Sequence, residues 1–165
     1  MAYKSLMQFV EELETNNLLI RITAPVSTEL EITEIADRIS KQPGGGKALL
    51  FENNGTKFPL LINALGSDNA MKLALNVSNY DDITDEIQQL FKTIAGPKNS
   101  LLEKIKTLPV LSGIAAWLPK VKSGRGVCQE VVHENPDLGI LPVLKCWPFD
   151  GGKFITFPMV NTKDP

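Results

Sequence analysis

The chain has 165 residues, of which 43% are hydrophobic and 22% are charged, and its formal net charge is -2. These values are ordinary for a globular protein, and the length suits one domain and a fraction of a second. A net charge this small gives no support for binding to nucleic acid or to an anionic membrane surface.

The residues that mark metal sites or secretion are sparse. Cys128 and Cys146 stand far apart and His133 is the single histidine, so the ligand spacing of a zinc site is absent. We expect two reduced, buried thiols and a surface position for the histidine. The N-terminus lacks the apolar core of a signal peptide, and no apolar run approaches the roughly 20 residues that span a bilayer. The expected location is therefore the cytoplasm.

Helical and strand patterns alternate from the N-terminus. A capping pair, Ser5 and Gln8, predicts a helix with an apolar stripe formed by Leu6, Phe9, Val10 and Leu13. A short strand is expected at 18–22. A second pair, Thr28 and Glu31, predicts a helix that begins near Thr28, with an apolar stripe formed by Ile32, Ile35, Ala36 and Ile39.

The stretch "PGGGK" resembles a phosphate-binding loop in composition but not in order. A phosphate loop follows a strand and opens a helix, so that backbone N–H groups face the phosphate. Here a helical pattern precedes Gly44–Gly46 and an apolar strand at 48–51 follows. We therefore expect these glycines to end the helix and to form a turn.

A hairpin and two helices are expected next. Apolar strands at 48–51 and 60–65 flank the turn signal "NNG", which predicts that they pair. Helices are expected at 68–75 and 82–95, and Gly96-Pro97 stops the second one. Up to this point the pattern is that of a mixed α/β domain.

The character of the chain changes in its last third. After one or two short helices between residues 99 and 118, the basic, glycine-containing stretch at 120–126 is typical of a linker. Strands are expected at 128–132 and 153–162, joined by a loop. Because Pro158 cannot donate a hydrogen bond to a ladder, the last strand should lie at an edge or carry a bulge. These strands look like the beginning of a β-domain.

Long segments of the chain resemble one protein family. The segments are "LEITEIADRISKQPGGGKALLFEN", "FPLLINALGS", "GRGVCQEVV" and "LPVLKCWPFDGGKFITFPMVNTKDP". In this order they resemble the N-terminal region of the UbiD family of reversible decarboxylases. The resemblance runs from about Ser5 to Pro165, and it is strongest toward members of quinone biosynthesis, the polyprenyl-4-hydroxybenzoate and menaquinone-type carboxy-lyases.

The resemblance implies a fold and a chemistry. It implies an N-terminal mixed α/β domain at 1–119, a linker at 120–126, and at 127–165 the first strands of a split β-barrel that binds prenylated FMN. A divalent metal, Mn or Mg, and K accompany the cofactor in the family. The substrates are aromatic or α,β-unsaturated acids, which lose CO2, and the enzymes form homo-oligomers.

The resemblance assigns few functional residues to this chain. The family's metal ligands and its proton-handling Arg and Glu residues match positions beyond Pro165, so no catalytic or metal-binding residue is expected here, and the chain alone should be inactive. Thr156 matches a residue that faces the flavin ring, where its hydroxyl could form a hydrogen bond. Its neighbours Phe157 and Pro158 are further cofactor-binding candidates. Thr156 could instead be a β-branched residue that only packs in a strand.

An alternative function is a non-catalytic regulatory or assembly subunit that keeps only the N-terminal domain. A natural short subunit should blunt its last strand with charge, because exposed strand edges aggregate. This chain stops within a motif at Asp164-Pro165, which favours the interpretation as part of an enzyme. Which acid is the substrate does not follow from the sequence.

Overall fold

The computed structural model describes residues 3–95 and 123–156, together with residues 109, 112, 113, 115, 118, 119, 121 and 159. The chain divides into two compact units, the first formed by Met1–Asn76 with Asp137–Pro165 and the second by Val77–Pro136. The domain limits expected from the sequence, with a linker at 120–126, remain a prediction.

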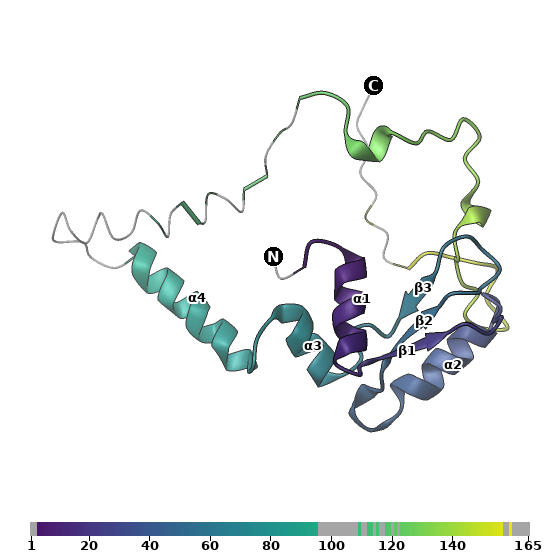
Figure 1. The fold of residues 1–165 in the computed structure, drawn as a ribbon, viewed down its shortest axis with the longest axis horizontal. Coiled ribbons are helices and arrows are strands. Elements are labelled where there is room, and N and C mark those ends of the chain that lie inside the picture. Colours follow the sequence, from purple (N-terminus) through teal and green to yellow (C-terminus); the bar gives the residue numbers. More distant parts are fainter. Residues whose placement is uncertain are drawn as a thin grey trace. The chain divides into compact units, whose positions relative to one another are not determined.

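A three-stranded sheet organises the first unit (Figure 1). Its strands are β1 (Leu19–Ile22), β2 (Ala48–Phe51) and β3 (Leu60–Ile62), in the order β1-β2-β3. The central strand β2 runs parallel to β1 and antiparallel to β3. The predicted hairpin is therefore confirmed, although its second strand ends at Ile62, where the following Asn63 turns the chain with a φ of 56°.

Three helices cover the two faces of this sheet: α1 (Leu6–Thr15), α2 (Glu31–Ser40) and α3 (Asp68–Leu75). Side chains alternate between the faces of a strand. Ala48 and Leu50 of β2 accordingly pack with α1 and α3, whereas Leu49 and Phe51 pack with α2. All four residues of β2 are buried, as expected for a central strand with helices on both faces.

The first helix begins where its capping pair predicts. The hydroxyl of Ser5 accepts a hydrogen bond from the Gln8 backbone N–H at 3.2 Å, and the Gln8 side chain accepts one from the Lys4 N–H at 2.9 Å. The predicted stripe is confirmed for its inner members, since Phe9, Val10 and Leu13 are buried and Leu6 is exposed.

The second helix begins later than predicted. It starts at Glu31 rather than near Thr28, and the Glu31 carboxylate accepts a hydrogen bond from the Ser27 N–H at 2.7 Å. The physical reason is tertiary: the Thr28 carbonyl accepts from the Lys145 N–H, and the Leu30 N–H donates to the Lys145 carbonyl. These backbone groups are thus used by a distant segment instead of by the helix.

The glycine stretch forms a turn, as predicted, and not a phosphate loop. Pro43–Gly45 is a single 3-10 turn after α2, and the φ of Gly44, Gly45 and Gly46 is positive. A Cβ on Gly45 would lie only 1.8 Å from the Gly66 carbonyl oxygen, so this close approach requires glycine. Lys47 donates to the Asn17 side chain at 2.8 Å, so its ammonium group has a structural partner.

The second unit contains α4 (Tyr80–Ala95), which begins two residues earlier than predicted. The Asp82 carboxylate accepts from the Asn79 N–H at 2.9 Å and so supports this earlier start. The strand predicted at 128–132 is wrong, because the chain forms a 3-10 turn at Val127–Gln129 and then continues without regular structure. The helices predicted between residues 99 and 118 lie outside the continuously described residues.

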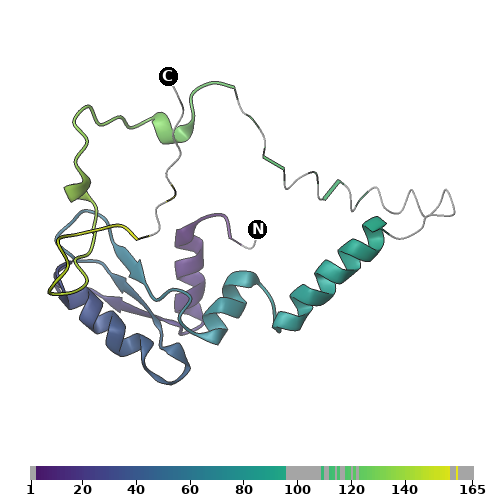
Figure 2. The ribbon, with the colours of Figure 1, turned by 180° about the vertical axis from the view of Figure 1, so that it is seen from behind.

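The last segment of the first unit, which begins at Asp137, comes back to the sheet and its helices (Figure 2). After a 3-10 turn at Leu138–Ile140, Lys145 forms an isolated parallel bridge with Glu29. The strand predicted at 153–162 is wrong for residues 153–156, which have no regular structure, and residues 157, 158 and 160–162 are not described. In the described part no strand lies beside Lys153–Thr156 to form a ladder.

Arg21 of β1 forms ion pairs with two neighbouring segments. Arg21 pairs with Glu14 of α1 at 2.7 Å and also with Glu52, directly after β2. The hydrogen bond to Arg21 lowers the pKa of Glu14 below its ordinary range, and both carboxylates raise the pKa of Arg21.

Replacing the largest fully buried side chain should destabilise the fold strongly. Phe51→Ala removes a ring with no exposed surface, so we expect the free energy of unfolding in urea to fall by about 3–5 kcal/mol. Phe58→Ala is the matched control, because this ring is 45% exposed, and its cost should be no more than about 1 kcal/mol. Equal costs for the two variants would contradict the position of the core.

The Glu14–Arg21 pair should make stability depend on pH. Because the folded-state pKa of Glu14 is lowered, its contribution is present above the ordinary pKa of 4.5 and is lost as the pH falls through the lowered value. Glu14→Gln should therefore reduce the urea midpoint at neutral pH, and the difference from the parent should shrink in acid. Glu11→Gln, an equal charge change on the same helix, should show no such trend.

Candidate functional site

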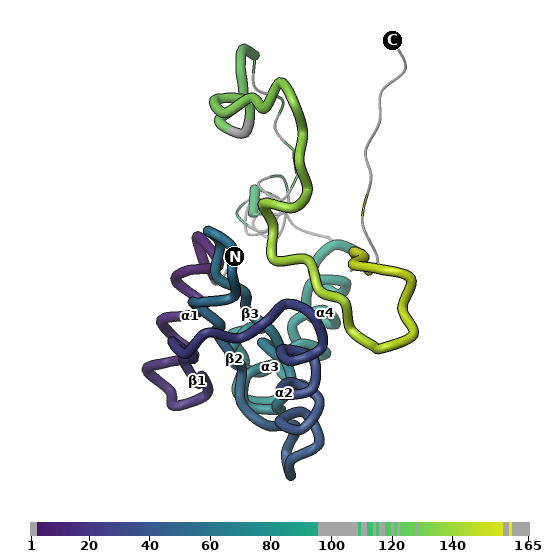
Figure 3. Tube along the Cα trace, turned by 90° about the vertical axis from the view of Figure 1, so that its right-hand side faces the viewer, coloured from purple at the N-terminus to yellow at the C-terminus, as the bar shows by residue number. Residues whose placement is uncertain are grey.

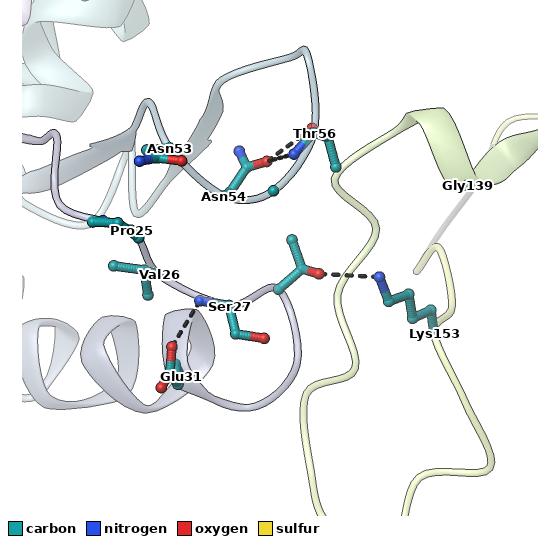
Figure 4. Close-up of a pocket in the computed structure, with 11 residues that line it drawn as sticks. Pro25, Val26, Ser27, Glu31, Asn53, Asn54, Thr56, Gly139 and Lys153 are labelled. Atoms are coloured by element: carbon teal, nitrogen blue, oxygen red, sulfur yellow. Dashed lines mark hydrogen bonds between the residues drawn. The ribbon is translucent and has the colours of Figure 1, made fainter.

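A pocket of about 500 Å³ lies at the carboxyl ends of the two parallel strands (Figure 4). Because β1 and β2 are parallel, the loops that follow Ile22 and Phe51 start from the same edge of the sheet. Ligands of open α/β sheets commonly bind at this edge. The pocket is lined by Pro25, Val26, Ser27, Thr28, Glu31, Asn53, Asn54, Gly55, Thr56, Gly139 and Lys153.

A buried asparagine shapes one wall of this pocket. Asn54 is 3% exposed and donates to the Phe58 carbonyl at 2.9 Å. Its side-chain oxygen accepts from the Thr56 N–H at 3.1 Å and from the Thr56 hydroxyl at 2.8 Å. The loop after β2 is therefore closed around one amide group, whose donors and acceptor are all used.

The opposite wall is the entry to α2. The Ser27 hydroxyl accepts from the Glu29 N–H at 3.0 Å, and the Ser27 N–H donates to Glu31. The wall is linked to the first one by the backbone, since the Val26 N–H donates to the Asn53 carbonyl at 2.9 Å.

Lys153 brings a positive charge to the pocket from the returning segment. Its ammonium group donates to the Thr28 hydroxyl at 3.0 Å, and Thr28 is 7% exposed (Figure 4). No described carboxylate lies within 4.0 Å of this ammonium group. Two further N–H groups of Lys153 therefore remain for a ligand or for water.

An apolar hollow of about 320 Å³ borders the same lysine. It is lined by Leu138, Gly139, Leu141, Val143, Lys153, Phe154 and Ile155. The hollow and the pocket at the strand ends share Gly139 and Lys153. The pocket at the strand ends and the apolar hollow are therefore adjacent at Gly139 and Lys153.

The predicted cofactor residues lie at the end of the described segment. Thr156 is exposed and lines neither the pocket nor the hollow, whereas Phe157 and Pro158 lie outside the described residues. Their assignment to the flavin remains a prediction. His133 is exposed. Within the described ranges no group of three or more His, Cys, Asp or Glu side chains could hold a metal ion.

Sequence reasoning missed three residues that build this region: Thr28 as an acceptor, Asn54 and Lys153. The sequence predicts a helix cap at Thr28, and Asn54 belongs to the turn signal "NNG". Lys153 lies inside the "DGGKFIT" segment of the family resemblance, and this was the signal that could have identified it.

Among the described helices, none is long and apolar enough to cross a membrane.

Comparisons with known families identify the class of protein. The N-terminal domain of 3-octaprenyl-4-hydroxybenzoate carboxy-lyase matches residues 10–91. The Rift-related domain of the same carboxy-lyase matches residues 119–165. The chain therefore belongs to the UbiD family.

Relatives from distant organisms match the whole chain. It is 47% identical to an uncharacterized protein of Aquifex aeolicus over 99% of its length, and 42% identical to one of Archaeoglobus fulgidus over 100%. The chain spans 33% of the length of each of these relatives.

Two solved structures are also similar. Both are of the vanillic acid decarboxylase of Sedimentibacter hydroxybenzoicus in open form, and each is 27% identical, with a TM-score of 0.48. The likeness covers 54% of this chain and 20% of the other.

The loop after β2 should depend on its buried amide. Asn54→Ala leaves the Phe58 carbonyl and the Thr56 N–H with one partner fewer, so we expect a loss of about 1–3 kcal/mol in the free energy of unfolding. Asn53→Ala is the control, because Asn53 is exposed and its backbone carbonyl is kept; it should cost no more than about 0.5 kcal/mol. An Asn54 variant as stable as the control would contradict the role of the amide.

Proposed function

We propose that this chain is the N-terminal part of a carboxy-lyase that removes CO2 from an aromatic or α,β-unsaturated acid without net oxidation. The observation that carries the proposal is the order of the two matches, an N-terminal domain at 10–91 followed by a Rift-related domain at 119–165 of one carboxy-lyase family. The same order and the same segments carried the resemblance in the sequence.

The proposed cofactor is prenylated FMN, accompanied by a divalent metal, Mn or Mg, and K. The cofactor supplies the electron sink that the loss of CO2 requires. The residues present fit a flavin ring in two respects: the hollow lined by Phe154 and Ile155 is apolar, and Thr156, which follows it in the chain, is exposed. Thr156, Phe157 and Pro158 are the proposed contacts, and this chain is assigned no metal ligand.

The chain's own residues would bind the flavin ring and hold it in one orientation. An apolar wall excludes water from a planar ring, and a threonine hydroxyl donates to or accepts from a polar ring edge. The proposed substrates are acids of the kind used in quinone biosynthesis, and the proposed assembly is a homo-oligomer. Both proposals rest on the likeness to the family.

The activity should appear in the full-length protein that contains this chain. Purified with prenylated FMN, it should release CO2 from at least one acid in a panel of hydroxybenzoic acids, with and without a prenyl chain, and α,β-unsaturated acids. The 165-residue chain under the same conditions should release none, because the residues expected to bind metal and move protons match positions beyond Pro165. Flavin-loaded full-length protein that releases no CO2 from the whole panel would contradict the proposal.

A further inference from the structure

One buried threonine receives both ends of a loop in the returning segment. The Thr28 carbonyl accepts from the Lys145 N–H at 3.2 Å, and the Thr28 hydroxyl accepts from the Lys153 ammonium at 3.0 Å. Thr28 and Asn54 are the buried polar residues among those described. A buried hydroxyl that meets an ammonium group forms a charge-assisted hydrogen bond, which is stronger than a neutral one.

The first end of the loop is fixed by more than this residue. The Leu30 N–H donates to the Lys145 carbonyl at 3.0 Å, which completes the parallel bridge between Glu29 and Lys145. Leu144 packs against the core cluster that lies between α2 and β2. The backbone at 144–145 is thereby held on the N-terminal domain by hydrogen bonds and by apolar contact.

The loop between the two ends is closed on itself. The Trp147 N–H donates to the Asp150 carboxylate at 2.8 Å, and the Asp150 N–H donates to the Trp147 carbonyl at 3.1 Å. At its base the Phe154 N–H donates to the Leu144 carbonyl at 3.3 Å. In Figure 3 this loop is part of the yellow tube.

The exit of the loop has less support than its entry. Beyond the Phe154 backbone bond, the exit is joined to the N-terminal domain by the hydrogen bond between Lys153 and Thr28. Thr156 follows three residues later, so the direction in which the chain leaves Lys153 decides where this hydroxyl lies. The side chain of Thr28 thus contacts the residue from which the chain leaves toward the proposed flavin contact.

We infer that Thr28 is a positioning residue, through which the N-terminal domain holds residues 145–153 and so sets the place of Thr156 against the flavin. The placing of Thr156 against the flavin rests on the proposed function. The anchoring of the loop concerns the folded chain and is tested without any cofactor.

The first experiment is hydrogen exchange on the 165-residue chain. Thr28→Val keeps the shape and the carbonyl but removes the hydroxyl, and Lys153→Met removes the ammonium group. In both variants we expect the amides of Lys145 and Phe154 to exchange about tenfold faster, since a lost bond to a charged group makes local opening more frequent. The amides of β2, within the sheet, should keep their rates.

Two controls separate anchoring from a general loss of stability. Thr28→Ser keeps the hydroxyl and should retain the parent rates. Thr15→Val makes the same chemical change on α1, where the hydroxyl donates to the Glu11 carbonyl, and it should leave Lys145 and Phe154 unchanged. Parent-like exchange at both amides in Thr28→Val and Lys153→Met would overturn the anchoring.

The second experiment measures flavin retained per chain, by absorbance, in the full-length protein purified with prenylated FMN. Thr28→Val should retain less flavin than the parent, and Thr28→Ser should retain as much. Faster exchange with unchanged flavin content would overturn the positioning role. A parent protein that holds no flavin would overturn the proposed function, and the positioning role with it, while the exchange result would still decide the anchoring.

Discussion

The burial of β2 on both faces is the constraint on which the rest of the structure depends. Its residues alternate between a cluster with α1 and α3 and a cluster with α2, so four consecutive apolar residues serve two cores. A parallel neighbour, β1, requires a crossover, and α2 supplies it. The carboxyl ends of both parallel strands are thereby brought to one edge, where their two loops form the pocket.

The same arrangement explains why the returning segment attaches where it does. The crossover into α2 leaves backbone groups at Thr28 and Leu30 that the helix does not use, and Lys145 satisfies them. Buried backbone donors and acceptors need partners, so a later segment in this position contributes to the fold of the N-terminal domain.

Much of the fold could be predicted, because local signals and tertiary contacts agree there. The start of α1 at the Ser5 cap, the buried strand at 48–51 and the hairpin with β3 follow from the sequence. The start of α2 could not, because a bridge to residue 145 overrides its capping signal. The strand expected at 128–132 is wrong, because strand-forming residues form a strand only beside a neighbouring strand. The sequence assigns the site to Thr156, whereas the contact between Thr28 and Lys153 joins residues far apart in the chain that no local pattern connects.

The most direct test of this account is an experimental structure of the full-length protein with its flavin bound. We expect the Lys153 ammonium to remain within hydrogen-bond distance of the Thr28 hydroxyl while Thr156 contacts the isoalloxazine ring. A structure in which the segment 145–153 is detached from the N-terminal domain, or in which Thr156 points away from the flavin, would contradict it.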